Sequence, residues 1–253
     1  MKDTIKSLIP PLVLRYVPFG RSYTFSGNFG SWAEAKKRSR GYHSMEILDK
    51  VKRSALLVKQ GKAAFERDSV AFPEAEYPLP VLVNLLWVAS QNQGRLKVLD
   101  FGGSLASTYF QCRKYLQSLD ELKWSVVEQR HYVECGKEHF ETEHLKFHQS
   151  IKESINWQRP DVVLFGSVLQ YLEKPFNLFP ELFDSQIPCI LVDRTPFIKG
   201  RQDRICVQKI SARIYRASYP VRFFSSPKFI DFFSKKYRLW AEFGCDDKAN
   251  IPS

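Results

Sequence analysis

The chain has 253 residues, of which 44% are hydrophobic and 14% aromatic, and this composition excludes a disordered protein. Its net charge of +11 is unevenly spread, with 12 basic and 2 acidic side chains in residues 194–240 but 11 basic and 16 acidic in residues 71–193. The acidic centre argues against a nucleic-acid binder that uses its whole surface, and it leaves room for an anionic ligand held by the basic flanks.

Residues 1–72 predict a helical extension or lid. In residues 6–21, apolar side chains lie among basic ones, which suits either a peripheral contact with the inner face of a membrane or a tail packed on its own domain. The stretch lacks a cleavage site of small residues, so we expect no signal peptide. Ser31 and Glu34 form a capping box before a first helix, and apolar spacing predicts a second helix over residues 44–61.

Residues 73–253 predict a doubly wound α/β domain with a mostly parallel, Rossmann-like sheet. Prolines mark its start, and an apolar helix over residues 80–91 follows. Apolar strands that alternate with helices are typical of a parallel sheet covered on both faces. The expected strands are residues 97–101, 124–128, 145–147, 161–166 and 188–193, followed by a helix over 226–236 and a sixth strand over 237–243.

The first candidate site is the loop after the first strand of this domain. Ligands of such sheets bind beyond the carboxyl ends of the strands. Gly102 and Gly103 allow a tight turn and the close approach of a ligand, with Asp100 before them and Ser104 after. The next helix offers free N–H groups to a negative group. A third glycine and a Gly-Lys-Ser/Thr sequence are both missing, which excludes the dinucleotide and phosphate-loop motifs.

The second candidate is Glu128, at the end of the second strand. A carboxylate there can accept hydrogen bonds from both hydroxyls of a ribose. An acidic glycine loop followed by this acid suits an adenosine ligand that carries a carboxylate and an ammonium group, and S-adenosylmethionine matches that description. The alternative is an ordinary turn between strand and helix.

Residues 167–171 directly follow the fourth strand, and among them Gln170 and Tyr171 are candidates for the reacting centre. Gln170 can position a hydroxyl or amine, and Tyr171 can close the site or orient the acceptor. The alternative is a strand-end turn whose apolar neighbours belong to the core.

Candidate acid–base groups lie at two other strand ends. Asp193 is a candidate general base and Arg194 a candidate holder of an anionic acceptor, unless the two form a pair that only fixes a loop. His131 is the best-placed histidine for a base, because its ordinary pKa of about 6.5 suits proton removal at neutral pH. A structural histidine near a helix start is the alternative.

These segments together resemble class I S-adenosylmethionine-dependent methyltransferases, and more narrowly a family often encoded among genes for bacterial surface polysaccharides. The resemblance implies polysaccharide biosynthesis and places Gln129 and Ser167 among the cofactor contacts. Domains of this class end in an antiparallel hairpin, and we expect its last strand to be missing here. The matching stretches cover residues 98–104, 107–110, 127–129, 133–137, 167–172 and 193–197, together with 41–42, the helix to residue 61, and 66–69.

The segment after the fifth strand combines cations with aromatic rings. We expect Arg201, Arg204, Arg213 and Arg216, with Arg194, to recognise phosphate on the acceptor, and Tyr215 or Tyr219 to lie against its sugar or base. A solvated charged surface is the alternative. The leading hypothesis is methyl transfer to an oxygen or nitrogen of a glycan or sugar-nucleotide precursor. A non-catalytic module that binds a nucleoside, membrane or partner, or an RNA methyltransferase, would explain the same residues, although we expect no nucleic-acid partner.

The cysteines and histidines of the sequence indicate neither disulfides nor a metal site. The five cysteines are far apart and form no CxxC pair, so we expect neither a disulfide framework nor a structural zinc site. The histidines show no ligand spacing with acids or cysteines, and we predict no metal. No apolar run reaches the ~18 residues of a membrane span. The prediction is a cytoplasmic protein, and the oligomeric state does not follow from the sequence.

Overall fold

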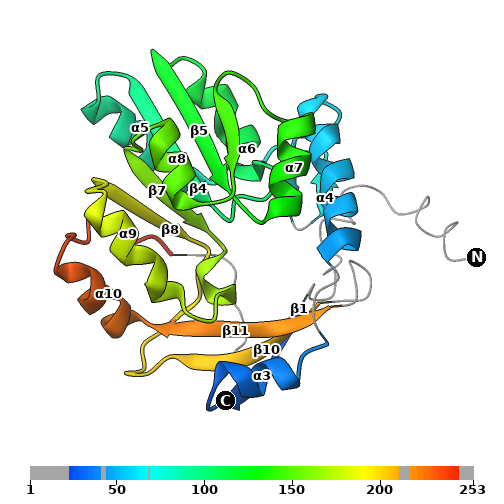
Figure 1. Cartoon of the computed structure of the whole chain (residues 1–253), viewed down its shortest axis with the longest axis vertical. Helices are drawn as coiled ribbons and strands as arrows, with labels where there is room; N and C mark the ends of the chain where they lie inside the picture. The colour runs from blue at the N-terminus through cyan, green and yellow to red at the C-terminus, as the bar shows by residue number, and fades with distance from the viewer. Residues whose placement is uncertain (1–22, 41–43, 68, 211–216, 245–253) are drawn as a thin grey trace, which may run out of the picture.

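A parallel sheet of five strands forms the centre of the molecule (Figure 1). In this computed structural model, residues 23–40, 44–67, 69–210 and 217–244 are described. The strand order is β6-β5-β4-β7-β8, and every neighbouring pair is parallel. From β4 the chain adds β5 and β6 on one side and β7 and β8 on the other, so the order of the strands reverses between β4 and β7. This confirms the predicted Rossmann-like sheet. The strands are β4 (Arg95–Phe101), β5 (Glu121–Val127), β6 (Leu145–His148), β7 (Val162–Gly166) and β8 (Cys189–Asp193).

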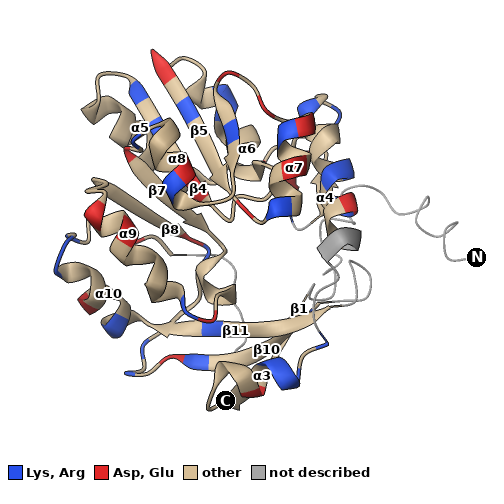
Figure 2. Ribbon diagram, viewed as in Figure 1, with Lys and Arg blue, Asp and Glu red and all other residues tan. Residues whose placement is uncertain are grey.

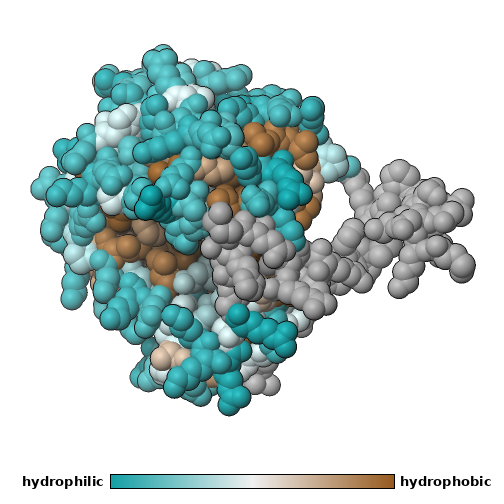
Figure 3. Space-filling view, turned by 45° about the vertical axis from the view of Figure 1, so that its right-hand side comes forward, coloured by the Kyte–Doolittle hydropathy of each residue, from teal (hydrophilic) through white to brown (hydrophobic). Residues whose placement is uncertain are grey.

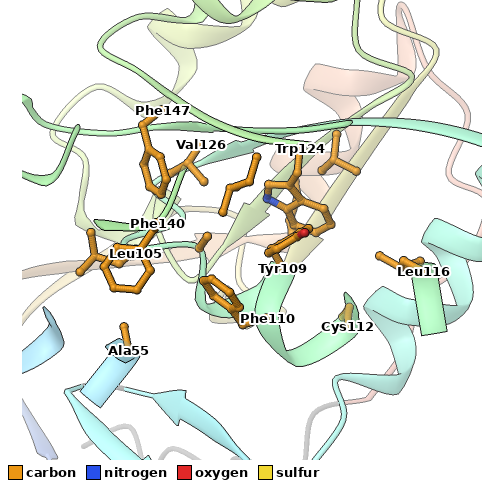
Figure 4. Packing of buried hydrophobic residues seen from close by; sticks show 14 of the residues in the cluster. Ala55, Leu105, Tyr109, Phe110, Cys112, Leu116, Trp124, Val126, Phe140 and Phe147 are labelled. Carbon is orange, nitrogen blue, oxygen red and sulfur yellow. The ribbon is translucent and has the colours of Figure 1, made fainter. Parts of the chain in front are cut away.

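Helices cover both faces of this sheet, each over its own hydrophobic cluster. Trp124 and Phe147 belong to the cluster under α4 to α7 (Figure 4), and Phe165 and Phe179 to the cluster under α8 to α10. Strands that bury apolar side chains on both faces need such cover, which is why each of the longer strands carries a run of apolar residues. The helices are α5 (Leu79–Gln91), α6 (Ser107–Leu116), α7 (Arg130–His139), α8 (Ile151–Trp157), α9 (Phe179–Asp184) and α10 (Ser226–Ser234), with the 3-10 turns η1 (Leu169–Tyr171) and η2 (Pro175–Leu178).

The described residues of the N-terminal part include the helices α3 and α4 and a small hairpin. The backbone N–H of Glu34 donates to Ser31 Oγ at 3.2 Å, which confirms the predicted cap of α3 (Trp32–Lys37). Helix α4 (Ser44–Lys59) packs its apolar side into the same core as the sheet, and β2 (Phe65–Arg67) pairs with β3 (Val70–Phe72). Helix α4 and the β2–β3 hairpin are therefore packed against the main domain, while the role of residues 1–72 as a lid stays a prediction.

A second sheet was not expected from the sequence. Its order is β1-β10-β11-β9, and β1 (Tyr23–Phe29), β10 (Arg204–Ile210) and β11 (Ser218–Ser225) pair antiparallel. Strand β9 (Phe197–Ile198) joins β11 in parallel. The long basic connection after β8 is thus largely strand, and its partner β1 comes from the opposite end of the chain. Figure 1 shows this sheet lying across the end of the parallel sheet.

The sixth strand expected over residues 237–243 is wrong. Residues 237–244 form no strand in the described chain, and β8 is the last strand of the parallel sheet. The segment is held by side chains instead of a ladder: the Tyr237 hydroxyl donates to the Ile187 carbonyl at 2.8 Å, and the Trp240 ring stacks on Trp87 of α5 at 4.9 Å. Among the described helices, none is long and apolar enough to cross a membrane, and residues 6–21 lie outside the described chain.

Candidate functional site

The predicted site residues gather where the strands of the parallel sheet end. The candidate residues of the site lie in the last residues of β4 and β8 or directly after β4, β5, β7 and β8, except His131, which lies in the first turn of α7. This edge faces the second sheet (Figure 1), and Figure 3 shows hydrophobic residues gathered between two largely hydrophilic regions at that level of the molecule. In sheets of this kind, the crevice beyond the strand ends at the reversal of strand order is the usual ligand site.

The backbone at this edge is unusually strained. Positive φ angles occur at Ser104 (55°) and Ala106 (67°) after β4, at Ser167 (58°) after β7 and at Arg194 (47°) after β8. Such angles cost non-glycine residues of the order of 1 kcal/mol or more and tend to collect where a site requires a fixed geometry. Four of them at one edge single out these loops.

Asp100 lies beneath the glycine loop. Its side chain is only 1% exposed and accepts a hydrogen bond from Trp124 Nε1 at 3.2 Å. Burial raises the pKa of this carboxyl to about 7, the Glu128 carboxylate also raises it, and Trp124 and Arg194 lower it. A carboxyl that titrates near neutral pH in this position is typical of a functional site.

The glycine loop has a packing role that the sequence did not predict. A Cβ atom at Gly103 would lie 2.5 Å from Asp100 Cγ, and one at Gly102 would lie 2.4 Å from Val168 Cγ2. Gly102 also has a φ of +72°, which disfavours any side chain. Both glycines are therefore required by the protein's own packing, whatever a ligand needs from them.

Glu128 joins two loops of the site. Its carboxylate accepts hydrogen bonds from the backbone N–H of Gln129 at 2.8 Å and of Ser104 at 3.3 Å. Burial raises its pKa, while these two hydrogen bonds lower it. The carboxylate thus lies beside the glycine loop, as the sequence predicted, and Gln129 begins α7 as an exposed cap residue. Their contacts with a cofactor stay predictions.

Gln170 presents a buried acceptor at the centre of the edge. It is 3% exposed, and its Nε2 donates to Ser167 Oγ at 2.9 Å and to the Arg194 carbonyl at 3.3 Å. A carbonyl can only accept, so the amide orientation is determined. Gln170 Oε1 is buried without a hydrogen-bond partner among the described residues. A donor from a ligand would satisfy it.

Asp193 and Arg194 form the pair that the sequence analysis left as an alternative. Arg194 Nε lies 3.0 Å from Asp193 Oδ2, and the Ser167 N–H donates to the Asp193 carbonyl at 2.9 Å. A Cβ at Gly166 would lie 3.7 Å from Arg194 Nη2 and 4.0 Å from Thr108 Oγ1. The partly exposed guanidinium therefore lies beside the end of β7 and the first turn of α6, and its contact with an anion stays a prediction.

Tyr171 connects the edge to the second sheet. Its hydroxyl donates to Gln208 Oε1 of β10 at 3.1 Å, and its ring meets that of Tyr219 of β11 edge-on at 5.2 Å. The turn η1 thus packs against β11. His131 lies elsewhere, with its ring 5.0 Å from that of Tyr132 and its Nε2 buried without a partner among the described residues. Its role as a base stays a prediction.

The arginines predicted to bind phosphate lie in different environments or outside the described residues. Arg204 donates to the Gly27 carbonyl at 3.4 Å, so it is used within the second sheet, and Arg201 is exposed in the β9–β10 turn. Arg213, Tyr215 and Arg216 lie outside the described residues. Figure 2 shows cations on both sheets rather than one basic surface.

Glu66 is a residue whose place the sequence analysis did not predict. It is 6% exposed, and its carboxylate accepts hydrogen bonds from the Ser69 N–H at 2.8 Å and from the Ser107 hydroxyl at the start of α6. A carboxylate at a helix N-terminus is favoured by the helix dipole. The available signal was the stretch from residue 66 to 69, which the resemblance included without a role.

The described residues show no group of three or more His, Cys, Asp or Glu side chains that could hold a metal ion. Four cysteines, Cys112, Cys135, Cys189 and Cys206, are free thiols, and Cys245 lies outside the described chain.

No family model matches the sequence, and no curated protein is similar to it. Among solved structures, the N-terminal domain of EvdMO1 in the presence of SAH and D-fucose is similar at 15% identity and a TM-score of 0.42, over 78% of this chain and 89% of that one. Human N-acetylserotonin methyltransferase in complex with SAM gives 14% and 0.41, over 61% and 45%. SAM-bound CalS10, an amino pentose methyltransferase from Micromonospora echinaspora involved in calicheamicin biosynthesis, gives 8% and 0.40, over 62% and 80%.

Proposed function

We propose that this protein is an S-adenosylmethionine-dependent methyltransferase that acts on an oxygen or nitrogen of a glycan or sugar-nucleotide precursor. The observation that carries the proposal is the placement of Asp100 and Glu128 around the glycine loop, at the carboxyl edge of the parallel sheet beside the reversal of its strand order. Strained backbone on three of the loops at this edge supports a site that is built for a ligand.

The residues fit a nucleoside that carries an ammonium group. Glu128 binds two backbone N–H groups, and a carboxylate has about four acceptor positions, so it can still accept from ribose hydroxyls. Gln170 Oε1 is a buried acceptor that an ammonium or hydroxyl donor would satisfy. Both groups are acceptors and therefore require hydrogen-bond donors on the ligand. A pyrophosphate offers only acceptors, so the two groups favour this cofactor over a pyrophosphate.

The chain's own contribution is alignment and control of charge. S-adenosylmethionine, when bound, supplies an electrophilic methyl group. The acceptor has to be held in line with it and shielded from water, and these tasks need fixed side chains rather than a protein nucleophile. We assign positioning to Gln170 and Tyr171, and the contact with an anionic group of the acceptor to Arg194. His131 and Asp193 are the proposed bases.

Titration calorimetry with S-adenosylhomocysteine tests the cofactor. We expect Glu128→Gln to weaken binding at least about tenfold, because hydrogen bonds to a charged group contribute roughly 1.5–3 kcal/mol each. Glu134→Gln is the matched control, since Glu134 is exposed on α7 and pairs with Arg130. Equal affinities of the two variants would remove Glu128 from the site.

Methyl transfer itself is tested with a labelled donor on a panel of sugar nucleotides. Label on a sugar nucleotide supports the proposal. Binding of S-adenosylhomocysteine without transfer to any of them would favour a non-catalytic module, and transfer to RNA alone would replace the acceptor class.

A further inference from the structure

One row of side chains crosses the second sheet on the face turned toward the site. In the strand register, Phe25 of β1 pairs with Gln208 of β10, and Gln208 pairs with Tyr219 of β11. Directly paired residues of antiparallel strands share a face. Tyr171 of η1 contacts both Gln208 and Tyr219, so this face looks toward the carboxyl edge of the parallel sheet. We call Phe25, Tyr171, Gln208 and Tyr219 the platform.

The cations of β10 and β11 lie mostly on the opposite face. Lys209 and Arg222 alternate with the platform residues, and Arg222 lies over the Trp32 ring of α3 at 5.6 Å. Arg222 also pairs with Asp203 at 3.2 Å and donates to the Glu173 carbonyl at 3.0 Å. On the platform face of β10 and β11, Arg204 is the only charged residue, and its side chain donates to the Gly27 carbonyl. The platform itself is uncharged.

The chemistry of the platform is that of aromatic rings around an amide. The Tyr171 hydroxyl donates to Gln208 Oε1, and the amide nitrogen of this residue, which is 5% exposed, carries the N–H donors of the platform. Aromatic faces pack against the C–H faces of a sugar ring, and an amide N–H donates to the oxygen of a hydroxyl. A nucleic-acid backbone or a phosphate needs cations, and of the three in β10 and β11, Lys209 and Arg222 lie on the opposite face while Arg204 donates to the Gly27 carbonyl. The combination suits an uncharged polyhydroxylated ring.

We propose that the platform binds the sugar ring of the methyl acceptor and that strand β1, from the N-terminal part of the chain, thereby belongs to the acceptor site. The inference rests on the proposed function and deepens it. Tyr171 follows Gln170 directly, so a ring held on the platform lies next to the buried acceptor of the edge, with Arg194 beside it for a charged group of the same ligand.

Saturation-transfer NMR tests this with four probes: UDP-glucose, UDP-galactose, GDP-mannose and dTDP-glucose, each with and without S-adenosylhomocysteine. We expect saturation of the hexose protons of at least one probe. Tyr219→Leu should weaken that probe's binding about fivefold to tenfold, because it removes the ring and keeps an apolar side chain. Tyr219→Phe should retain binding, and Trp240→Ala, which removes an exposed ring on the C-terminal segment, should leave it unchanged.

Several results would overturn the platform. These are no hexose saturation with any probe, equal affinity in Tyr219→Leu and wild type, or saturation confined to the nucleotide protons. Binding of a single-stranded RNA oligonucleotide that depends on Tyr219 would assign the platform to RNA instead. Calorimetry with S-adenosylhomocysteine on the same samples separates the two proposals. If the wild-type protein does not bind S-adenosylhomocysteine, the methyltransferase proposal fails, whereas the platform is decided by the saturation of the sugar protons alone.

Discussion

Asp100 makes the stability of the protein depend on pH. Its pKa is about 7 in the folded chain, raised from the ordinary 3.8 of an aspartate, so between these values the folded state binds the proton more tightly than the unfolded state. Stability contributed by the protonated carboxyl is therefore present at low pH and lost as the pH rises toward 7. Asp100→Asn should remove this loss. In urea unfolding, we expect the free energy of unfolding of Asp100→Asn relative to that of wild type to rise from pH 5 to pH 7 by on the order of 1 kcal/mol per pH unit. A constant difference across this range would show that the carboxyl does not titrate there.

Gly103 tests whether the glycine loop is built for packing. Gly103→Ala places a methyl group against the buried Asp100 carboxyl, where the Cβ position is 2.5 Å from Cγ. Overpacking of this kind costs about 1–3 kcal/mol, so we expect a lower free energy of unfolding without any ligand. Gly200→Ala is the control, because the nearest atom to its Cβ position is 3.9 Å away. Unchanged stability of Gly103→Ala with lost cofactor binding would instead assign the glycine to ligand access.

At the scale of elements, the β2–β3 hairpin fastens the N-terminal part to α6. Glu66 holds the Ser107 hydroxyl and the Ser69 N–H, so Glu66→Gln should lower the free energy of unfolding by about 1–2 kcal/mol. Glu76→Gln is the control: it breaks the exposed pair of Glu76 with Arg67, which is worth at most about 1 kcal/mol. Urea unfolding of both variants makes the measurement. Equal losses would mean that Glu66 has no anchoring role beyond that of a surface charge.

At the scale of the whole molecule, the candidate site lies at the ends of the buried strands and in the loops that follow them. Amides of β4 and β7 lie in strands buried on both faces, and loops open with less free energy than such strands. We expect S-adenosylhomocysteine to slow hydrogen exchange in residues 101–108, 127–131 and 166–172 and to leave α5 unchanged. Peptide-level exchange with and without the ligand provides the readout. Equal protection of α5 and the loops would indicate a general stabilisation and would count against this location of the site.

Local pattern determined the parallel sheet of this protein. Its longer strands carry runs of apolar residues toward their ends, Asp100 lies near the end of β4, and Glu128 directly follows β5, so neighbours in the chain carry the signal. The second sheet left no such signal. Its strands contain Arg204, Lys209 and Arg222 among apolar residues, and β10 finds its partner in β1 across most of the chain. Charged residues interrupt the apolar pattern that predicts a strand, and the pairing of strands far apart in the chain leaves no local pattern.

The sequence by itself therefore determined the Rossmann-like sheet and the loops that bear the candidate site. Only the tertiary structure decided what those residues touch. It buried Asp100 beneath Gly103, left Gln170 Oε1 without a partner among the described residues, and turned Gln208 and Tyr219 toward the site while Arg222 faces α3. The physical reason is that burial, hydrogen-bond partners and the face of a strand depend on residues far apart in the chain, and only packing brings these together.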